Sequence, residues 1–501
     1  MPQQTRSSAS RIKIDPQKAV GLIHDYARQA MDQCKVPGMG LAVILGDEVI
    51  SAAGLGRKDV GASEAVDEKT LFQVGSTTKA FTSTLVAMLA DESKLSWDDP
   101  VIDHLPDFRL FDPFLTREVR VRDLMCHRTG LADHDGDSLW YLFGHPTKET
   151  IRRIRYLKPT WSLRSKFAYH NIMWAAAGAV VEAVGRQDWS EAVTERLFGP
   201  LGMSKSATTV GDLKSGADVA TPHDEAAGRT RAIPLRSFDT IAAAGSILSS
   251  AHDMARWLRF HLAQGVHEGR QIISSANIQE MQLPQTIIHR GDNPHMDLFV
   301  PEETSFLTYG LGWFLYDYAG LKLAEHAGST DGMSALVAML PQEKLGLVVL
   351  TNKQASTLPH GVLYRALDIF LGREERDWSS QLLQKYEAAL AELAAAEEET
   401  KKGRIEGAAP SLPLEGYAGT FENQMYGQAV ITHQQGVLEL RLLPDGFFGP
   451  LEHWHQDVFR FPVASPYFDH VWISFTLTAA GRIEGMRMEV TGILPLDCRL
   501  K

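Results

Sequence analysis

Length, composition and charge narrow what this chain can be. Its 501 residues exceed what one hydrophobic core usually supports, so we expect two domains. The 62 acidic and 50 basic residues give a net charge of −12 with no long Lys/Arg run, which argues against nucleic acid and membrane surfaces as partners. Three scattered cysteines, Cys34, Cys126 and Cys498, argue against a disulfide framework and a cysteine-rich metal site.

The N-terminal residues, MPQQTRSSASRIKID, lack the apolar core of a secretory signal and predict a short disordered tail over residues 1–14. No apolar run in the sequence is long enough to cross a bilayer. The expected location is therefore cytoplasmic.

Two pairs of apolar runs frame the first three quarters of the chain. A helix starting at Asp15-Pro16 precedes the first pair, which turns at 46–48. The second pair, 334–340 and 345–350, comes late, and the sequence between the pairs is mostly helical. This order predicts an α+β domain over residues 15–375, an antiparallel sheet flanked by helices with an inserted helical region.

The last quarter differs in character. Strong helix formers fill 378–402, and a Gly/Pro-containing stretch follows, so we predict a helical linker over 376–412. Short alternating strands separated by glycine turns then predict a small all-β domain over 413–501, a barrel or a sandwich.

Ser76 and Lys79 form the first chemical motif, at the mouth of an apolar helix that follows a strand-like run. Side chains three residues apart share one helix face, so a desolvated lysine can take the serine proton. The pattern alone is weak evidence, because Ser10 and Lys13 repeat it in the tail.

Tyr169-His170-Asn171 forms the second motif, in a loop before an apolar helix. A tyrosine beside a lysine ammonium can have its pKa lowered enough to share proton transfer. The Asn171 amide can orient Lys79 or bind a substrate carbonyl. The alternative is a loop tyrosine that packs on the core.

His326-Ala-Gly328-Ser329 forms the third motif, before the late strand pair. Gly328 allows close approach to the backbone, and the N–H groups of Ser329 and Ser76 are the expected oxyanion hole. The same His-x-Gly form occurs at His134 and His267, but in polar turns.

In this order, the three motifs resemble the serine β-lactamase-like superfamily, closest to its class C β-lactamase, D,D-peptidase, D-aminopeptidase and esterase branch. The resemblance covers about residues 17–372, and short segments such as Tyr309-Gly-Leu-Gly-Trp313 support it. The C-terminal part resembles the lipocalin-like domain of some members. The resemblance implies that Ser76 attacks the acyl carbon and that Lys79 and Tyr169 move protons. It also implies that Asn171 and His326 bind substrate, with no metal or cofactor.

His326 departs from the lysine that many β-lactamases carry at this place. One reading is an imidazolium that anchors a substrate carboxylate, and the other is a neutral ring that donates a hydrogen bond and shapes the cleft.

Three other groups have plainer interpretations. His453 and His455 have metal-ligand spacing on a strand but no obvious third ligand, which favours a packed pair. The run Asp133 to Asp137 lacks the register of a calcium loop and is interpreted as a polar loop near the cleft. His127 fits a loop-capping role.

We therefore expect a metal-free serine hydrolase of esterase, amidase or D-peptidase type acting on a small-molecule or short-peptide acyl donor. An acyltransferase shares the same intermediate and remains the alternative. A non-catalytic scaffold has no physical need of Ser76, Lys79 and Tyr169 together. The C-terminal barrel is expected to cover the cleft, to mediate homo-oligomerisation or to be a structural appendage.

Overall fold

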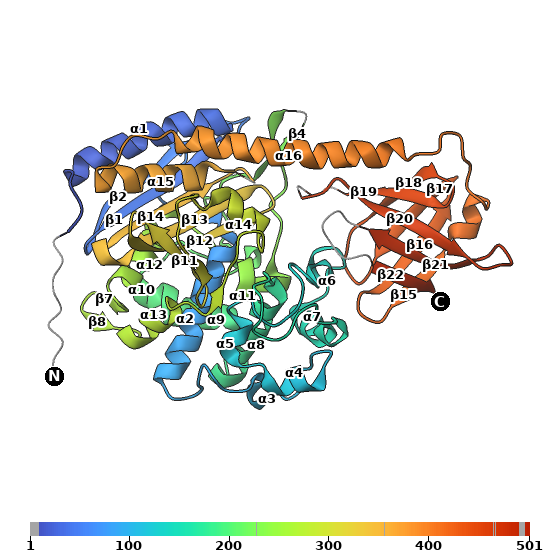
Figure 1. The fold of residues 1–501 in the computed structure, drawn as a ribbon, viewed down its shortest axis with the longest axis horizontal. Coiled ribbons are helices and arrows are strands. Elements are labelled where there is room, and N and C mark those ends of the chain that lie inside the picture. The colour runs from blue at the N-terminus through green and yellow to red at the C-terminus, as the bar shows by residue number, and fades with distance from the viewer. Residues whose placement is uncertain (1–9, 227, 355, 464, 466, 490–495) are drawn as a thin grey trace.

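A computed structural model describes residues 10–226, 228–354, 356–463, 465, 467–489 and 496–501. Figure 1 shows a sheet with helices on both faces and a separate β-barrel, joined by one long helix. None of the helices in the described ranges is long and apolar enough to cross a membrane. The cytoplasmic location stays a prediction.

The first body is built on one antiparallel sheet of eight strands in the order β2-β1-β14-β13-β12-β11-β10-β9. Its central strands are buried along their whole length because helices cover both faces. The early and late strand pairs lie side by side, since β1 pairs with both β2 and β14. The strands are β1 (Gly38–Leu45), β2 (Glu48–Gly56), β9 (Thr286–Ile287), β10 (Leu307–Tyr309), β11 (Phe314–Tyr318), β12 (Leu321–Thr330), β13 (Met333–Leu340) and β14 (Leu345–Thr351).

Opposite faces of β14 show how the layers are formed. Leu345 and Leu347 face α15, whereas a Cβ on Gly346 would meet Leu258 of α12 at 2.9 Å. Asp15 caps α1 by accepting from the Lys18 N–H at 2.9 Å. The helices are α1 (Pro16–Cys34), α2 (Thr78–Asp91), α3 (Val101–His104), α4 (Pro113–Glu118), α5 (Val121–Leu124), α6 (Asp137–Tyr141), α7 (Thr147–Arg153), α8 (Asn171–Gly185), α9 (Trp189–Val193), α10 (Gly199–Leu201), α11 (Ala242–Gly245), α12 (Ala251–Leu262), α13 (Ser275–Met281), α14 (Pro294–Phe299), α15 (Leu358–Leu371) and α16 (Trp378–Lys402).

The second body is a closed barrel of strands β15 to β22, in chain order. In β17 every second residue is buried, as expected for a strand with one face inward. Closure leaves the barrel without free edges and confirms the expected all-β barrel, while the sheet confirms the α+β class. The strands are β15 (Gly419–Asn423), β16 (Gly427–Gln434), β17 (Val437–Leu442), β18 (Phe448–His455), β19 (Val458–Pro462), β20 (His470–Leu477), β21 (Ile483–Glu489) and β22 (Leu496–Leu500).

The barrel docks on the segment that runs from α6 to α7. The Phe447 N–H donates to the Leu142 carbonyl at 3.0 Å, and His145 Nε2 donates to the Tyr426 carbonyl at 2.7 Å. Tyr426 also stacks on Phe143 with 5.7 Å between ring centroids. These contacts place barrel loops next to the inserted helical region, which carries part of the site described below.

Candidate active site

Ser76 lies in the short 3-10 helix η1 (Gly75–Thr77), which leads directly into α2. Lys79 is on the first turn of α2 and fully buried. Its Nζ donates to Ser76 Oγ at 2.9 Å, to Asn171 Oδ1 at 2.8 Å and to the Ala244 carbonyl at 3.0 Å. The predicted serine and lysine are therefore in direct contact.

The amine of Lys79 is strongly desolvated. Burial lowers its pKa from 10.5 to about 7, while the charge of Asp137 acts in the opposite direction. A lysine with a pKa near 7 is largely neutral just above neutral pH. Its lone pair can then accept the Ser76 proton, which an ordinary surface lysine cannot do.

Tyr169 lies over Lys79, with Nζ 4.8 Å from the ring centroid, and its hydroxyl interacts with Ser76. Its ring stacks on His127 with 4.2 Å between centroids. Burial raises the pKa of Tyr169, so the expectation that the lysine lowers this pKa is wrong. Desolvation of the phenolate outweighs the hydrogen bond with Ser76, which acts in the opposite direction, so Tyr169 is a protonated phenol that can donate.

Asn171 begins α8 and connects Lys79 to a carboxylate. Its Oδ1 accepts from Lys79, and its Nδ2 donates to Asp137 Oδ2 at 2.8 Å. Of the two expected roles for this amide, orienting Lys79 is the one for which the structure shows contacts.

His326 is buried in β12, and both of its ring nitrogens are engaged. A carbonyl only accepts, so Nδ1 donates to the Ala327 carbonyl at 2.6 Å, and Nε2 then accepts from the Tyr309 hydroxyl at 2.9 Å. Burial, helped by Lys79, lowers the pKa of His326 to about 3. The geometry favours the neutral ring over the imidazolium anchor.

Gly328 and Ser329 lie directly against the serine turn. A Cβ on Gly328 would be 2.0 Å from the Val74 carbonyl oxygen and 3.0 Å from the Ser76 nitrogen. Gly75, at φ +51°, would place its Cβ 2.7 Å from the Ser329 nitrogen. Only glycine permits this approach. The backbones of Ser76 and Ser329 lie together, as an oxyanion hole requires.

The structure thus brings all seven predicted site residues into one place, but the sequence interpretation missed other members. The sequence pattern places Asp137 in a polar loop and gives Tyr309 no role beyond a supporting segment. The Ala244 carbonyl offers no side-chain signal. Tyr467, from the barrel, has its hydroxyl 3.5 Å from Ser329 Oγ across 138 residues of sequence.

His127 and the barrel histidines have local partners. His127 Nδ1 accepts from the His170 N–H at 3.0 Å, as a capping residue does. His455 Nδ1 accepts from the Ile405 N–H at 2.9 Å, and a bulge interrupts the strand between His453 and His455. These two barrel histidines are thus not a regular period-two pair.

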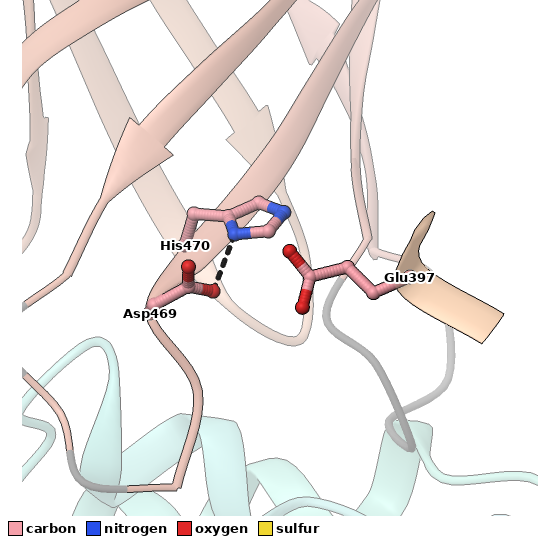
Figure 2. Close-up of side chains that lie close together, drawn as sticks. All are labelled: Glu397, Asp469 and His470. Carbon is pink, nitrogen blue, oxygen red and sulfur yellow. Dashed lines mark hydrogen bonds and ion pairs between the residues drawn. The ribbon is translucent and has the colours of Figure 1, made fainter. Parts of the chain in front are cut away.

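Among the described residues, one group could offer three ligand atoms to a metal: Glu397, Asp469 and His470, within 4.8 Å of one another. Figure 2 shows the Glu397 carboxylate from α16 facing the His470 ring. His470 Nδ1 already donates to Asp469 at 2.5 Å, and Glu397 pairs with Lys401 at 2.9 Å. Each side of the cluster thus has a partner within its own segment of the chain, and the cluster lies where α16 meets the barrel. The metal-free site stays a prediction.

Comparison with known proteins adds to this geometry. The Beta-lactamase family profile matches residues 23–370. The chain belongs to the Beta-lactamase family. A second profile, a domain of unknown function (DUF3471), matches residues 403–498 and so covers most of the barrel.

Two curated relatives span most of the chain. Unguisins hydrolase ungD of Aspergillus violaceofuscus is 29% identical over 441 residues, covering 80% of this chain and 75% of the relative. Penicillin-binding protein 4 of Amycolatopsis lactamdurans is 29% identical over 350 residues, covering 66% of this chain and 85% of the relative. An octameric penicillin-binding protein homologue from Pyrococcus abyssi has the same fold, with a TM-score of 0.62 and 23% identity over 96% of this chain and all of that one.

Proposed function

We propose that this protein is a serine hydrolase of esterase, amidase or D-peptidase type that works through an acyl-enzyme on Ser76. The observation that carries the proposal is the contact of 2.9 Å between Lys79 Nζ and Ser76 Oγ, with a lysine pKa of about 7. A relative named a hydrolase over 80% of this chain supports the same class.

In the proposed acylation, neutral Lys79 removes the Ser76 proton while Oγ bonds to the acyl carbon. The N–H groups of Ser76 and Ser329 stabilise the oxyanion of the tetrahedral intermediate. Tyr169 gives its proton to the leaving group as the bond to the acyl carbon breaks, and it regains a proton from the lysine ammonium.

In the proposed deacylation, water takes the place of the leaving group. Its proton goes to Lys79 as its oxygen bonds to the acyl carbon, and Ser76 Oγ leaves with a proton. An amine or alcohol acceptor at the same place makes the protein an acyltransferase. Neutral His326 shapes this cleft through Tyr309 without fixing a charge for the substrate.

Labelling tests the proposal. A fluorophosphonate should add its mass to the peptide that contains Ser76, and Ser76→Ala should abolish both the adduct and the turnover of p-nitrophenyl esters. A panel of esters, D-amino-acid amides and a chromogenic β-lactam, with and without added amines, then separates hydrolysis from transfer. An adduct on another residue, or none with any donor, would refute the proposal.

A further inference from the structure

Asp137 is a buried carboxylate beside the proposed catalytic groups, at the start of α6. The preceding Gly136 has φ +84°, and a Cβ there would lie 2.8 Å from Ile172 Cδ1. Glycine therefore lets this loop pack directly against the first turn of α8. The loop is also tied to the tyrosine motif, because the His134 N–H donates to the Tyr169 carbonyl at 2.7 Å.

The hydrogen bonds of Asp137 determine how the Asn171 amide is oriented. Asp137 Oδ2 accepts from Asn171 Nδ2 at 2.8 Å and from His134 Nδ1 at 2.9 Å, while Oδ1 accepts from Trp140 Nε1 at 2.9 Å. A carboxylate only accepts, so the NH₂ end of the amide must face it. The amide oxygen then faces Lys79, and the flipped amide would point donors at the lysine.

Asp137 also places a negative charge close enough to Lys79 to act on the lysine pKa. Within the described part of the chain, the three acceptors of Lys79 are neutral, and the carboxylate that raises the lysine pKa against burial is Asp137. The other titratable groups acting with Lys79 are the histidines and the tyrosine around it: His127, His134, His326 and Tyr169. Burial lowers the pKa of His127 and of His326, so both are neutral, and Tyr169 is a phenol.

His134 is the exception among these histidines. Its side chain is half exposed, and its bond to Asp137 helps to raise its pKa despite desolvation. A protonated His134 partly offsets the charge of Asp137. The effect of Asp137 on the lysine therefore depends on whether His134 carries a proton.

We propose that Asp137 is a positioning residue that acts through Asn171: it fixes the amide with its oxygen toward Lys79 and provides the negative charge nearest the lysine along this chain of hydrogen bonds. The inference rests on the proposed function, in which Lys79 is the base for Ser76. The inference gives the loop from Asp133 to Asp137 a chemical role, whereas the sequence predicts only that this loop lies near the cleft.

The test is the pH dependence of Ser76 acylation by a fluorophosphonate and of kcat/KM for a neutral ester. For Asp137→Asn we expect the ascending limb to move to lower pH by about one unit, because a positive shift on the lysine pKa is lost. The plateau should fall about 10- to 100-fold as the amide loses its orientation. Asp135→Asn is the matched control, since Asp135 is a buried carboxylate of the same loop whose pKa is raised to about 6. Asp135→Asn should leave the ascending limb of the pH profile at the wild-type pH.

Two further variants separate positioning from general damage. In an Asn171→Ala background, Asp137→Asn should lower the plateau no further, because its partner is gone. His134→Gln leaves Asp137 in place and removes a positive charge, so the limb should move to higher pH. His134→Gln still tests the inference if Asp137→Asn does not fold.

The inference would be overturned if the ascending limb of the pH profile for Asp137→Asn coincided with that of the wild type, or if Asp135→Asn shifted this limb equally. An unmoved limb in His134→Gln would also overturn it. These outcomes differ from failure of the proposed function, in which the wild-type protein itself acquires no adduct on Ser76.

Discussion

Lys79 places an amine in the protein interior with three neutral acceptors around it in the described structure. Its ammonium form is stabilised less than in water, which is the physical cause of a pKa near 7. The same desolvation that makes the lysine a usable base makes its protonated form destabilising to the fold. Catalytic competence and stability therefore oppose each other at this residue.

Replacing Lys79 by methionine should show this opposition as a function of pH. The folded pKa is about 7 and the unfolded value is 10.5, so the unfolded state binds more protons between them. Wild-type stability from this group rises with pH through that window, by about 1.4 kcal/mol per pH unit. The stability of Lys79→Met relative to wild type should thus be greatest at pH 6 and decline toward pH 9, in denaturant unfolding. A pH-independent difference would contradict the low lysine pKa.

At the scale of elements, the site depends on how closely β12 approaches η1. The two segments meet backbone to backbone, and Gly75 and Gly328 leave no room for a side chain between them. β12 carries the Ser329 N–H and η1 carries the Ser76 N–H, so neither element holds both donors. The geometry of the oxyanion hole therefore depends on the tight packing between the two elements.

Gly328→Ala should therefore damage catalysis far more than its size suggests. The added methyl would overlap the Val74 carbonyl and push the Ser76 turn away from β12. We expect kcat to fall about 10²- to 10³-fold, as when an oxyanion donor is lost. Gly21→Ala on α1 is the control, because nothing lies within 4 Å of its new Cβ. It should raise stability by about 0.5–1 kcal/mol and leave kcat unchanged. Equal kinetics of the two variants would refute this account.

At the scale of the whole molecule, the barrel reaches the mouth of the site. Tyr141 Oη is 2.8 Å from Ser465 Oγ, and its ring lies 5.9 Å from that of Tyr467 between centroids. Removing the whole barrel would expose Tyr141 and Phe143, which are buried, so a deletion would confound stability with chemistry. A point variant at Tyr467 is the cleaner probe of the expected cleft-covering role.

Tyr467→Ala should widen access to Ser76. The phenol hydroxyl is 3.5 Å from Ser329 Oγ, so we expect kcat/KM for a bulky aromatic ester, relative to an acetyl ester, to rise about tenfold. Phe448→Ala provides a matched control, since Phe448 is 68% exposed and packs against Arg441 of the barrel. Identical selectivity in both variants would show that the barrel does not shape the cleft.

The sequence by itself determined the α+β class, a small all-β C-terminal domain and the residues with a side-chain chemical signature, whereas closure of that domain into a barrel came from the structure. Ser76 and Lys79 share a helix turn, so local periodicity brings them together, and glycine at Gly328 marks a close backbone approach. The alternation of apolar and polar residues after residue 413 likewise predicts short β-strands, because side-chain burial along a strand has a period of two.

Tertiary structure decided what burial and distant partners do to those residues. The phenol state of Tyr169 and the neutral ring of His326 follow from desolvation, which depends on segments packed around them and is not written in any local pattern. Asp137 acquires its contact with Asn171, and Tyr467 its place beside Ser329, only when segments 34 and 138 residues apart meet. Spacing along the chain carries no information about such contacts, because the packing of the whole core sets them.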